Sequence, residues 1–217
     1  MKQETVEHLK HVEAASAEAR PLLAKHGYLD TLRNVLVIAF IDQVLEHHEA
    51  MILLVRAGKT GSAFSLARSI FESSLRGLWF GLCATDAQLQ FFEQNDELPD
   101  DAAGKRMNMP KMAVAIDIVT GADPTDPADQ FFKDLKDRGW KTLCSYTHSG
   151  LLQLGRRFTG HSLEPSYTDE EIVEITTSST TCALLLIDRF LASHGHAAES
   201  KAAMALINTY GPLGPAV

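Results

Sequence analysis

The segment from Ser62 to Cys83 is the feature of this chain that most constrains its fold. Its apolar residues recur with the spacing of an α-helix, and on a helical wheel they cover an arc of about 180°. A face this broad has to be buried against other helices. Similar periodicity runs through most of the chain, and no segment alternates with the period of a strand. We therefore predict an all-α fold, a helical bundle of about four long helices plus several short helices.

Turn and capping signals set the expected helix boundaries. Thr168 and Glu171 form a capping box, and Pro110 suits the first turn of a helix. The run from Thr176 to Thr181 favours a strand by propensity, but the helical patterns on both sides favour a helix. We expect helices over residues 3–25, 30–57, 62–83, 86–95, 110–119, 128–137, 169–193 and 197–210.

The length of 217 residues predicts a single helical-bundle domain spanning residues 1–217. Within it, the N-terminal helix in residues 1–27 is expected at the periphery, because one of its faces is charged. Residues 96–108 are acidic and contain Pro99 and Gly104, so we expect a mobile loop there.

Charge and composition exclude several classes of protein. The formal net charge is -8, and no basic run exceeds Arg156-Arg157, which argues against a broad nucleic-acid surface but allows a small basic pocket. The longest apolar run, residues 35–41, is far shorter than the roughly 20 residues that span a bilayer. The polar N-terminus does not resemble a signal peptide. Three distant cysteines are typical of buried thiols in a reducing compartment, so we expect a cytoplasmic protein with no membrane partner.

The histidines and glycines of the chain lack the spacings of common metal and cofactor motifs. None of the nine histidines has Glu three residues before it, and His48 is not part of a His-Glu-x-x-His motif because Ile52 occupies the last position. Gly-Lys-Thr at residues 58–60 lacks the upstream glycine of a phosphate-binding loop, since position 53 is Leu. We expect no metal and no cofactor, with His47 packed inward and His48 facing water.

Three charged residues follow one another at helical spacing in residues 62–83. On the wheel, Arg68 and Glu72 lie at the edge of the apolar arc, and Arg76 lies further toward solvent. One interpretation is a surface salt-bridge ladder worth a few tenths of a kcal/mol per pair. The other is a buried Arg68–Glu72 pair that lines a cleft, because a desolvated pair is costly without a further role.

A second polar group stands far downstream, in the sequence Tyr-Thr-His-Ser-Gly at residues 146–150. His148 beside Tyr146 could act as a general acid or base, because the pKa of histidine lies near neutrality. Alternatively, His148 ends a helix before Gly150, where the helix dipole favours a cation. If this segment meets the helix of residues 62–83, then His148, Arg68, Glu72 and Tyr146 are the candidate catalytic residues.

Two patterns suggest a relationship to known families. Arg20–His26, Arg156–His161 and Arg189–His194 match the Arg-to-His spacing of HEPN domains, although three matches in one chain show that this pattern is unspecific. The stretch Leu66 to Glu72, preceded by a His-rich helix and followed by Tyr-x-His-x-Gly, resembles bacterial all-helical domains of unknown function that have been placed near HEPN proteins. The resemblance covers residues 30–190 in layout. It implies a compact bundle, often dimeric.

Two functions fit these observations. The favoured one is a non-catalytic module that dimerises and binds a protein partner or a small ligand, with apolar bulk at Trp79, Phe80, Phe91 and Phe92 available for a homodimer interface. The alternative is a HEPN-like, metal-independent endoribonuclease of a toxin or phage-defence system. In that case His148 would move a proton, Arg68 would stabilise charge on the RNA phosphate, Glu72 would hold Arg68 or orient His148, and Tyr146 would position the phosphate.

Overall fold

The computed structural model describes residues 1–24, 27–28, 30–123, 125–126 and 129–210. Within these ranges the secondary structure is helical, and the all-α prediction is confirmed. The helices are α1 (Gln3–Ala24), α2 (Leu32–Arg56), α3 (Thr60–Leu82), α4 (Asp86–Asn95), α5 (Met109–Val119), α6 (Phe131–Thr147), α7 (Leu151–Gly155), α8 (Asp169–Ser193) and α9 (Ala197–Tyr210).

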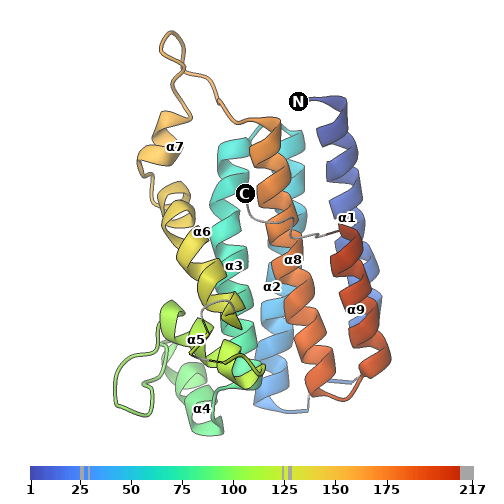
Figure 1. Cartoon of the computed structure of the whole chain (residues 1–217), viewed down its shortest axis with the longest axis vertical. Helices are drawn as coiled ribbons and strands as arrows, with labels where there is room; N and C mark the ends of the chain where they lie inside the picture. Colours follow the sequence, from blue (N-terminus) through green and yellow to red (C-terminus); the bar gives the residue numbers. More distant parts are fainter. Residues whose placement is uncertain (25–26, 29, 124, 127–128, 211–217) are drawn as a thin grey trace.

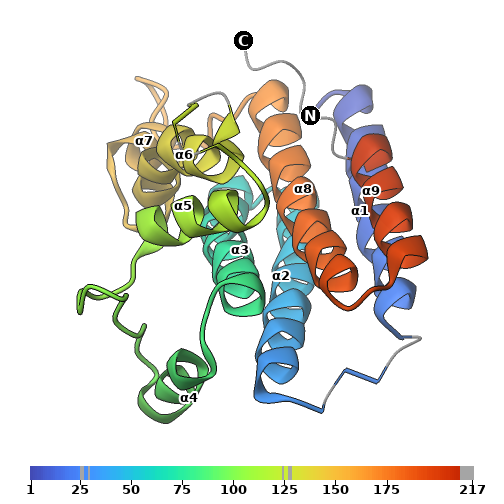
Figure 2. The ribbon, with the colours of Figure 1, turned by 60° about the horizontal axis from the view of Figure 1, so that its bottom comes forward.

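The long helices α1, α2, α3 and α8 run along the long axis of the molecule (Figure 1). The turn after Arg56 is short, with Gly58 at a φ of 70°, and it returns the chain so that α3 packs along α2. α8 contacts α1, α2, α3 and α9, which explains why about half of its residues are buried, polar ones such as Thr180 and Asp188 included. α5 and α6 pack on α3, and Figure 2 shows them on the side of α3 away from α1 and α9.

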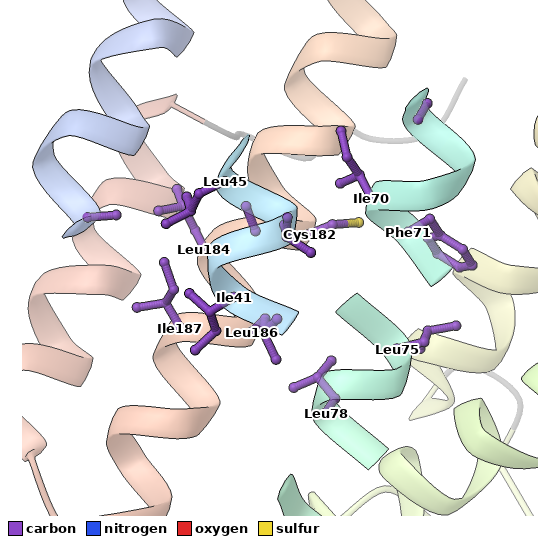
Figure 3. Packing of buried hydrophobic residues seen from close by; sticks show 14 of the residues in the cluster. Ile41, Leu45, Ile70, Phe71, Leu75, Leu78, Cys182, Leu184, Leu186 and Ile187 are labelled. Atoms are coloured by element: carbon purple, nitrogen blue, oxygen red, sulfur yellow. The ribbon is translucent and has the colours of Figure 1, made fainter. Parts of the chain in front are cut away.

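The core is centred on α3 and α8. Figure 3 shows Cys182 of α8 directed toward Ile70 of α3, with Leu186 and Leu78 further along the same pair of helices. The prediction that the apolar bulk of α3 serves a dimer interface was wrong for Trp79 and Phe80. Both side chains are buried in the chain's own core, as expected for large apolar groups at the centre of a bundle.

A polar seam crosses the apolar core between α1, α2 and α8. His48 is fully buried, and its two ring nitrogens are hydrogen bonded to Ser16 Oγ and Thr180 Oγ1, each at 2.8 Å. His8 Nε2 meets Thr176 Oγ1 at 2.9 Å in the same layer. The prediction that His48 faces water was therefore wrong, because His48 packs inward and two hydroxyl groups satisfy its ring. His47 is partly buried, with its Nδ1 shielded from solvent.

The threonine run of α8 is helical although threonine favours strands. Thr180 and Thr181 donate to the backbone carbonyl groups four residues earlier, at 2.8 and 3.0 Å, so their hydroxyl groups are satisfied within the helix. The helical prediction for this segment is confirmed. The capping box of Thr168 and Glu171 is confirmed as well.

The prediction for residues 128–137 was wrong in extent. α6 begins at Phe131 and runs to Thr147, and residues 127–128 lie outside the described ranges. The buried Asp117 on α5 caps this helix from a distance: its two carboxylate oxygens accept hydrogen bonds from the backbone N–H groups of Phe132 and Lys133. An acid at a helix N-terminus is favourable, and this one fixes α6 to α5.

None of the helices in the described part of the chain combines the length and the apolar character that crossing a membrane requires.

Candidate functional site

The end of α6 is fastened to the first turns of α3 by Ser65. The Ser65 hydroxyl donates to the backbone carbonyl of Tyr146 at 3.0 Å, and Thr147 Oγ1 donates to the Ser65 carbonyl at 3.3 Å. Gln153 on α7 donates to Ser65 Oγ at 3.0 Å. These hydrogen bonds fix the end of α6 so that His148 lies beside Arg68. Arg68 is one turn after Ser65 on α3.

Arg68 and His148 are in contact. Arg68 Nη1 donates to Nε2 of His148, and the guanidinium lies over the ring of Trp140, 4.9 Å from its centroid. Because an arginine can only donate, His148 Nε2 is the acceptor and the ring proton is on Nδ1 in this arrangement. The two distant segments therefore meet, with Trp140 beside them.

Glu72 extends this group along α3. Its Oε2 lies 3.6 Å from Arg68 Nε, and its Oε1 accepts a hydrogen bond from Arg76 Nη2 at 2.5 Å. The side chains of Arg68, Glu72 and Arg76 are 18%, 25% and 30% exposed. Arg76 is the most exposed of the three, in the order that the helical wheel predicted, although it pairs with Glu72 and its Nε is buried.

His148 also ends α6, as the alternative interpretation required. Its backbone N–H donates to the carbonyl of Cys144 at 2.9 Å. The next residue, Ser149, takes a left-handed conformation with φ of 54°, which is uncommon for a residue with a side chain. Gly150 follows in close contact with Ser145, where a Cβ atom would collide. This tight turn presents the His148 ring toward α3 rather than along the axis of α6.

Tyr146 belongs to a different face of α6. Its buried ring packs edge-on against Phe64, with 5.2 Å between the ring centroids. Three of the four candidate residues, Arg68, Glu72 and His148, thus form one connected group, and Tyr146 lies in the wall of a neighbouring cleft.

The cleft lies between α6 and α8, which both pack on α3, and has a volume of about 500 Å³. Its floor is the apolar face of α3. The residues that line it on α3 are Phe64, Ala67, Ile70 and Phe71; those on α6 include Leu135, Leu143 and Tyr146; those on α8 include Ile175, Ser178 and Cys182. Burial raises the pKa of the Cys182 thiol to about 12, so this group is neutral at pH 7 and acts as part of the apolar floor.

Four charged side chains are part of the cleft lining: Asp134, Arg138, Glu171 and Glu174. Arg138 binds Asp134 through two contacts, 2.9 Å from Nε to Oδ1 and 2.8 Å from Nη2 to Oδ2. Glu171 accepts from Arg156 and from the backbone N–H of Thr168. The remaining charged residue of the lining is Glu174.

Sequence reasoning missed Ser65, Trp140 and the cleft. Ser65 is an ordinary polar residue on a helix, and nothing in its neighbourhood in the sequence indicates that it joins α3 to α6. The cleft depends on the spacing of α6 and α8 along α3, which is a property of the packed bundle.

The Arg-to-His pairs that match the HEPN spacing are not part of the group formed by Arg68, Glu72 and His148. Arg156 pairs with Glu171, and the ring of His194 is hydrogen bonded to Asn34 and to the carbonyl of Phe190. His26 lies outside the described residues.

The chain matches the model of DUF6988, a family of unknown function, over residues 41–211, and it belongs to this family. Comparison with curated proteins and with solved structures found no match.

Proposed function

We propose that this member of the DUF6988 family is a non-catalytic helical binding module, and that the cleft between α3, α6 and α8 takes a small apolar ligand. The observation that carries the proposal is the size and lining of the cleft. Small-molecule sites are typically cavities of about 300–1,000 Å³ with mostly apolar walls and a few polar groups. A cleft of about 500 Å³ with a mostly apolar lining and a few charged side chains has this character.

A blocked cleft tests the proposal. Ser178 is partly buried and lines the cleft from α8, so Ser178→Trp places an indole ring in the ligand volume without removing a core side chain. Ser62→Trp is the matched control, since Ser62 is exposed near the start of α3. Binding of a fluorescent apolar probe should be saturable in wild type and in Ser62→Trp and should be lost in Ser178→Trp. Equal binding by all three proteins would contradict a cleft site.

We also infer that the module is a homodimer in a reducing compartment such as the cytoplasm. The three cysteines, Cys83, Cys144 and Cys182, are unpaired, which supports a reducing compartment. Support for a second copy comes from the apolar surface of α7 and the loop after it, where the side chains of Leu151 and Leu163 are 87% and 84% exposed. Leu152, Leu154 and Phe158 of the same segment are exposed as well, and a surface rich in exposed apolar side chains often marks an interface between chains.

The dimer is tested by solution mass. Leu151→Glu combined with Leu163→Glu should convert a dimer to a monomer in light scattering. Leu53→Glu is the control, because Leu53 is an exposed leucine on α2 and is not part of α7 or of the loop after it. A wild-type protein that is monomeric at high micromolar concentration would contradict the inference.

The contact between Arg68 and His148 favours a second function, metal-independent cleavage of RNA by a HEPN-like toxin or phage-defence protein. The guanidinium of Arg68 would turn from His148 to the RNA phosphate and stabilise its negative charge, and the freed Nε2 of His148 would accept the proton of a ribose 2′-hydroxyl. The 2′-oxygen would form a bond to the adjacent phosphorus while the bond from phosphorus to the 5′-oxygen breaks, and the protonated His148 would return its proton to that leaving oxygen. Glu72 is placed to hold Arg68. In an RNA-degradation assay, His148→Ala should abolish cleavage, and His161→Ala, at an exposed histidine, should not. Intact RNA after incubation with wild-type protein would exclude this function.

A further inference from the structure

The charged side chains of the cleft lining, taken together with their ion-pair partners, have a net negative charge. The Asp134 carboxylate is neutralised by the bidentate Arg138, and the Glu171 carboxylate is neutralised by Arg156. Arg138 is the cation of the cleft lining and is already paired. The carboxylate of Glu174 is exposed, and within the described part of the chain no ion pair involves it. The cleft therefore carries one uncompensated negative charge.

This charge lies at one end of an elongated apolar surface. Glu174 is in the N-terminal part of α8, and Cys182, at the buried floor, is eight residues further along the helix. At the rise of an α-helix the two positions are about 12 Å apart. Between them, Ile175 and Ser178 face the cleft. The lining thus has a net negative charge at its Glu174 end, whereas toward Cys182 the charged side chains are the mutually neutralised Asp134 and Arg138.

We propose that the ligand of this cleft is an elongated apolar molecule that carries one cationic nitrogen, with the nitrogen at Glu174 and the apolar body against Ile70, Phe71 and Cys182. This inference rests on the proposed function and adds the chemical class of the ligand. A carboxylate at the same end of the ligand would face Glu174 with like charge and lose affinity.

Three probes of equal chain length separate the apolar contribution from the charge: decylammonium, decanol and decanoate. Their affinities are measured by isothermal titration calorimetry at pH 7 and low salt. Because exposed ion pairs contribute modestly, we expect wild type to prefer decylammonium over decanoate by about tenfold, with decanol between them. Glu174→Gln should bring the three affinities together without weakening decanol. Glu174→Lys should reverse the order.

Net charge is controlled with Glu93→Gln, which removes an exposed carboxylate on α4, outside the cleft lining. This variant should keep the wild-type preference. A preference for decylammonium that persists in Glu174→Gln would overturn the inference, because it would arise from the overall charge of -8.

Failure of the inference can be told apart from failure of the proposed function. If decanol binds to wild type and not to Ser178→Trp, but decylammonium and decanoate bind equally, the cleft is a ligand site and the cationic class is wrong. If none of the three probes binds to wild type, the proposed function itself is wrong.

Discussion

At the scale of single residues, His48 couples the stability of the fold to pH. Burial lowers its pKa to about 4 in the folded chain, from a value near 6.5 in the unfolded chain. The unfolded state therefore binds the proton more readily, and His48 stabilises the fold fully above pH 6.5. This contribution, about 3 kcal/mol, should be lost as the pH falls from 6.5 toward 4. Urea unfolding at pH values from 7 to 4 measures it.

Replacement variants separate His48 from other titrating groups. His48→Gln keeps a side chain that can hydrogen bond to Ser16 and Thr180 but cannot be protonated, so its stability should change less with pH over this interval. A smaller dependence of stability on pH should remain in this variant, because burial also lowers the pKa of His8. His161→Gln, at an exposed position, should behave as wild type. An unchanged pH dependence in His48→Gln would contradict this assignment.

Ser74 provides a second prediction at this scale. Its hydroxyl is buried on α3 and has no hydrogen-bond partner within the described residues. Removing an unsatisfied hydroxyl should stabilise the chain, so we expect Ser74→Ala to raise the free energy of unfolding by about 1 kcal/mol and the melting temperature by about 2–4 °C.

The neighbouring Ser73 is a matched control for this variant. Its hydroxyl donates to Gln43 Oε1 at 3.0 Å, so Ser73→Ala should lower the free energy of unfolding by about 1 kcal/mol. Equal destabilisation by both substitutions would show that Ser74 has a partner in solution.

At the scale of helices, the threonine run of α8 shows what a local sequence pattern can predict and what it cannot. The flanking apolar periodicity correctly predicted a helix, because the hydroxyl groups are satisfied by the preceding turn. The pattern did not indicate that Thr176 and Thr180 face His8 and His48. That pairing depends on which faces of α1, α2 and α8 meet, and a histidine on a helix does not carry this information alone.

The capping of α6 by Asp117 leads to a prediction about this helix. Asp117→Ala removes the acceptors of the Phe132 and Lys133 amides, so it should destabilise the chain by about 1–2 kcal/mol. The loss should be concentrated at the start of α6. Hydrogen exchange should accelerate at these two amides, while the amides of α2 keep wild-type protection relative to global stability.

Asp117→Asn is the graded control, because its single amide oxygen can still accept one of the two bonds. It should fall between wild type and Asp117→Ala in both stability and exchange. Wild-type protection at Phe132 in Asp117→Ala would contradict the capping role.

At the scale of the whole molecule, the sequence predicted more of the fold than of the site. Arg68, Glu72 and His148 could be chosen because their side-chain chemistry and helical spacing are local. Their meeting depends on the length of α6, which was predicted ten residues too short at its C-terminal end; Gly139, a poor helix former, stands just after the predicted end. The cleft arises from three helices together, and no single helix contains its signal.

The position of α1 leads to the last prediction. The family match begins at residue 41, yet Leu9 and Val12 of α1 are fully buried, and α1 packs on α8 and α9. Its Ser16 also holds His48. We propose that α1 belongs to the same domain as the rest of the bundle. Deleting residues 1–24 would expose the apolar faces that α1 covers, and burial of Leu9 and Val12 alone contributes about 3–6 kcal/mol.

Because a domain of this size is stabilised by only about 5–15 kcal/mol in total, the truncated chain should lose its cooperative thermal transition in circular dichroism. Leu9→Ala is the milder variant and should cost about 2–5 kcal/mol, whereas Lys10→Ala, at an exposed position on the same helix, should have little effect. A truncated chain with a sharp transition at the wild-type temperature would show that residues 25–217 fold alone, with α1 as an accessory helix.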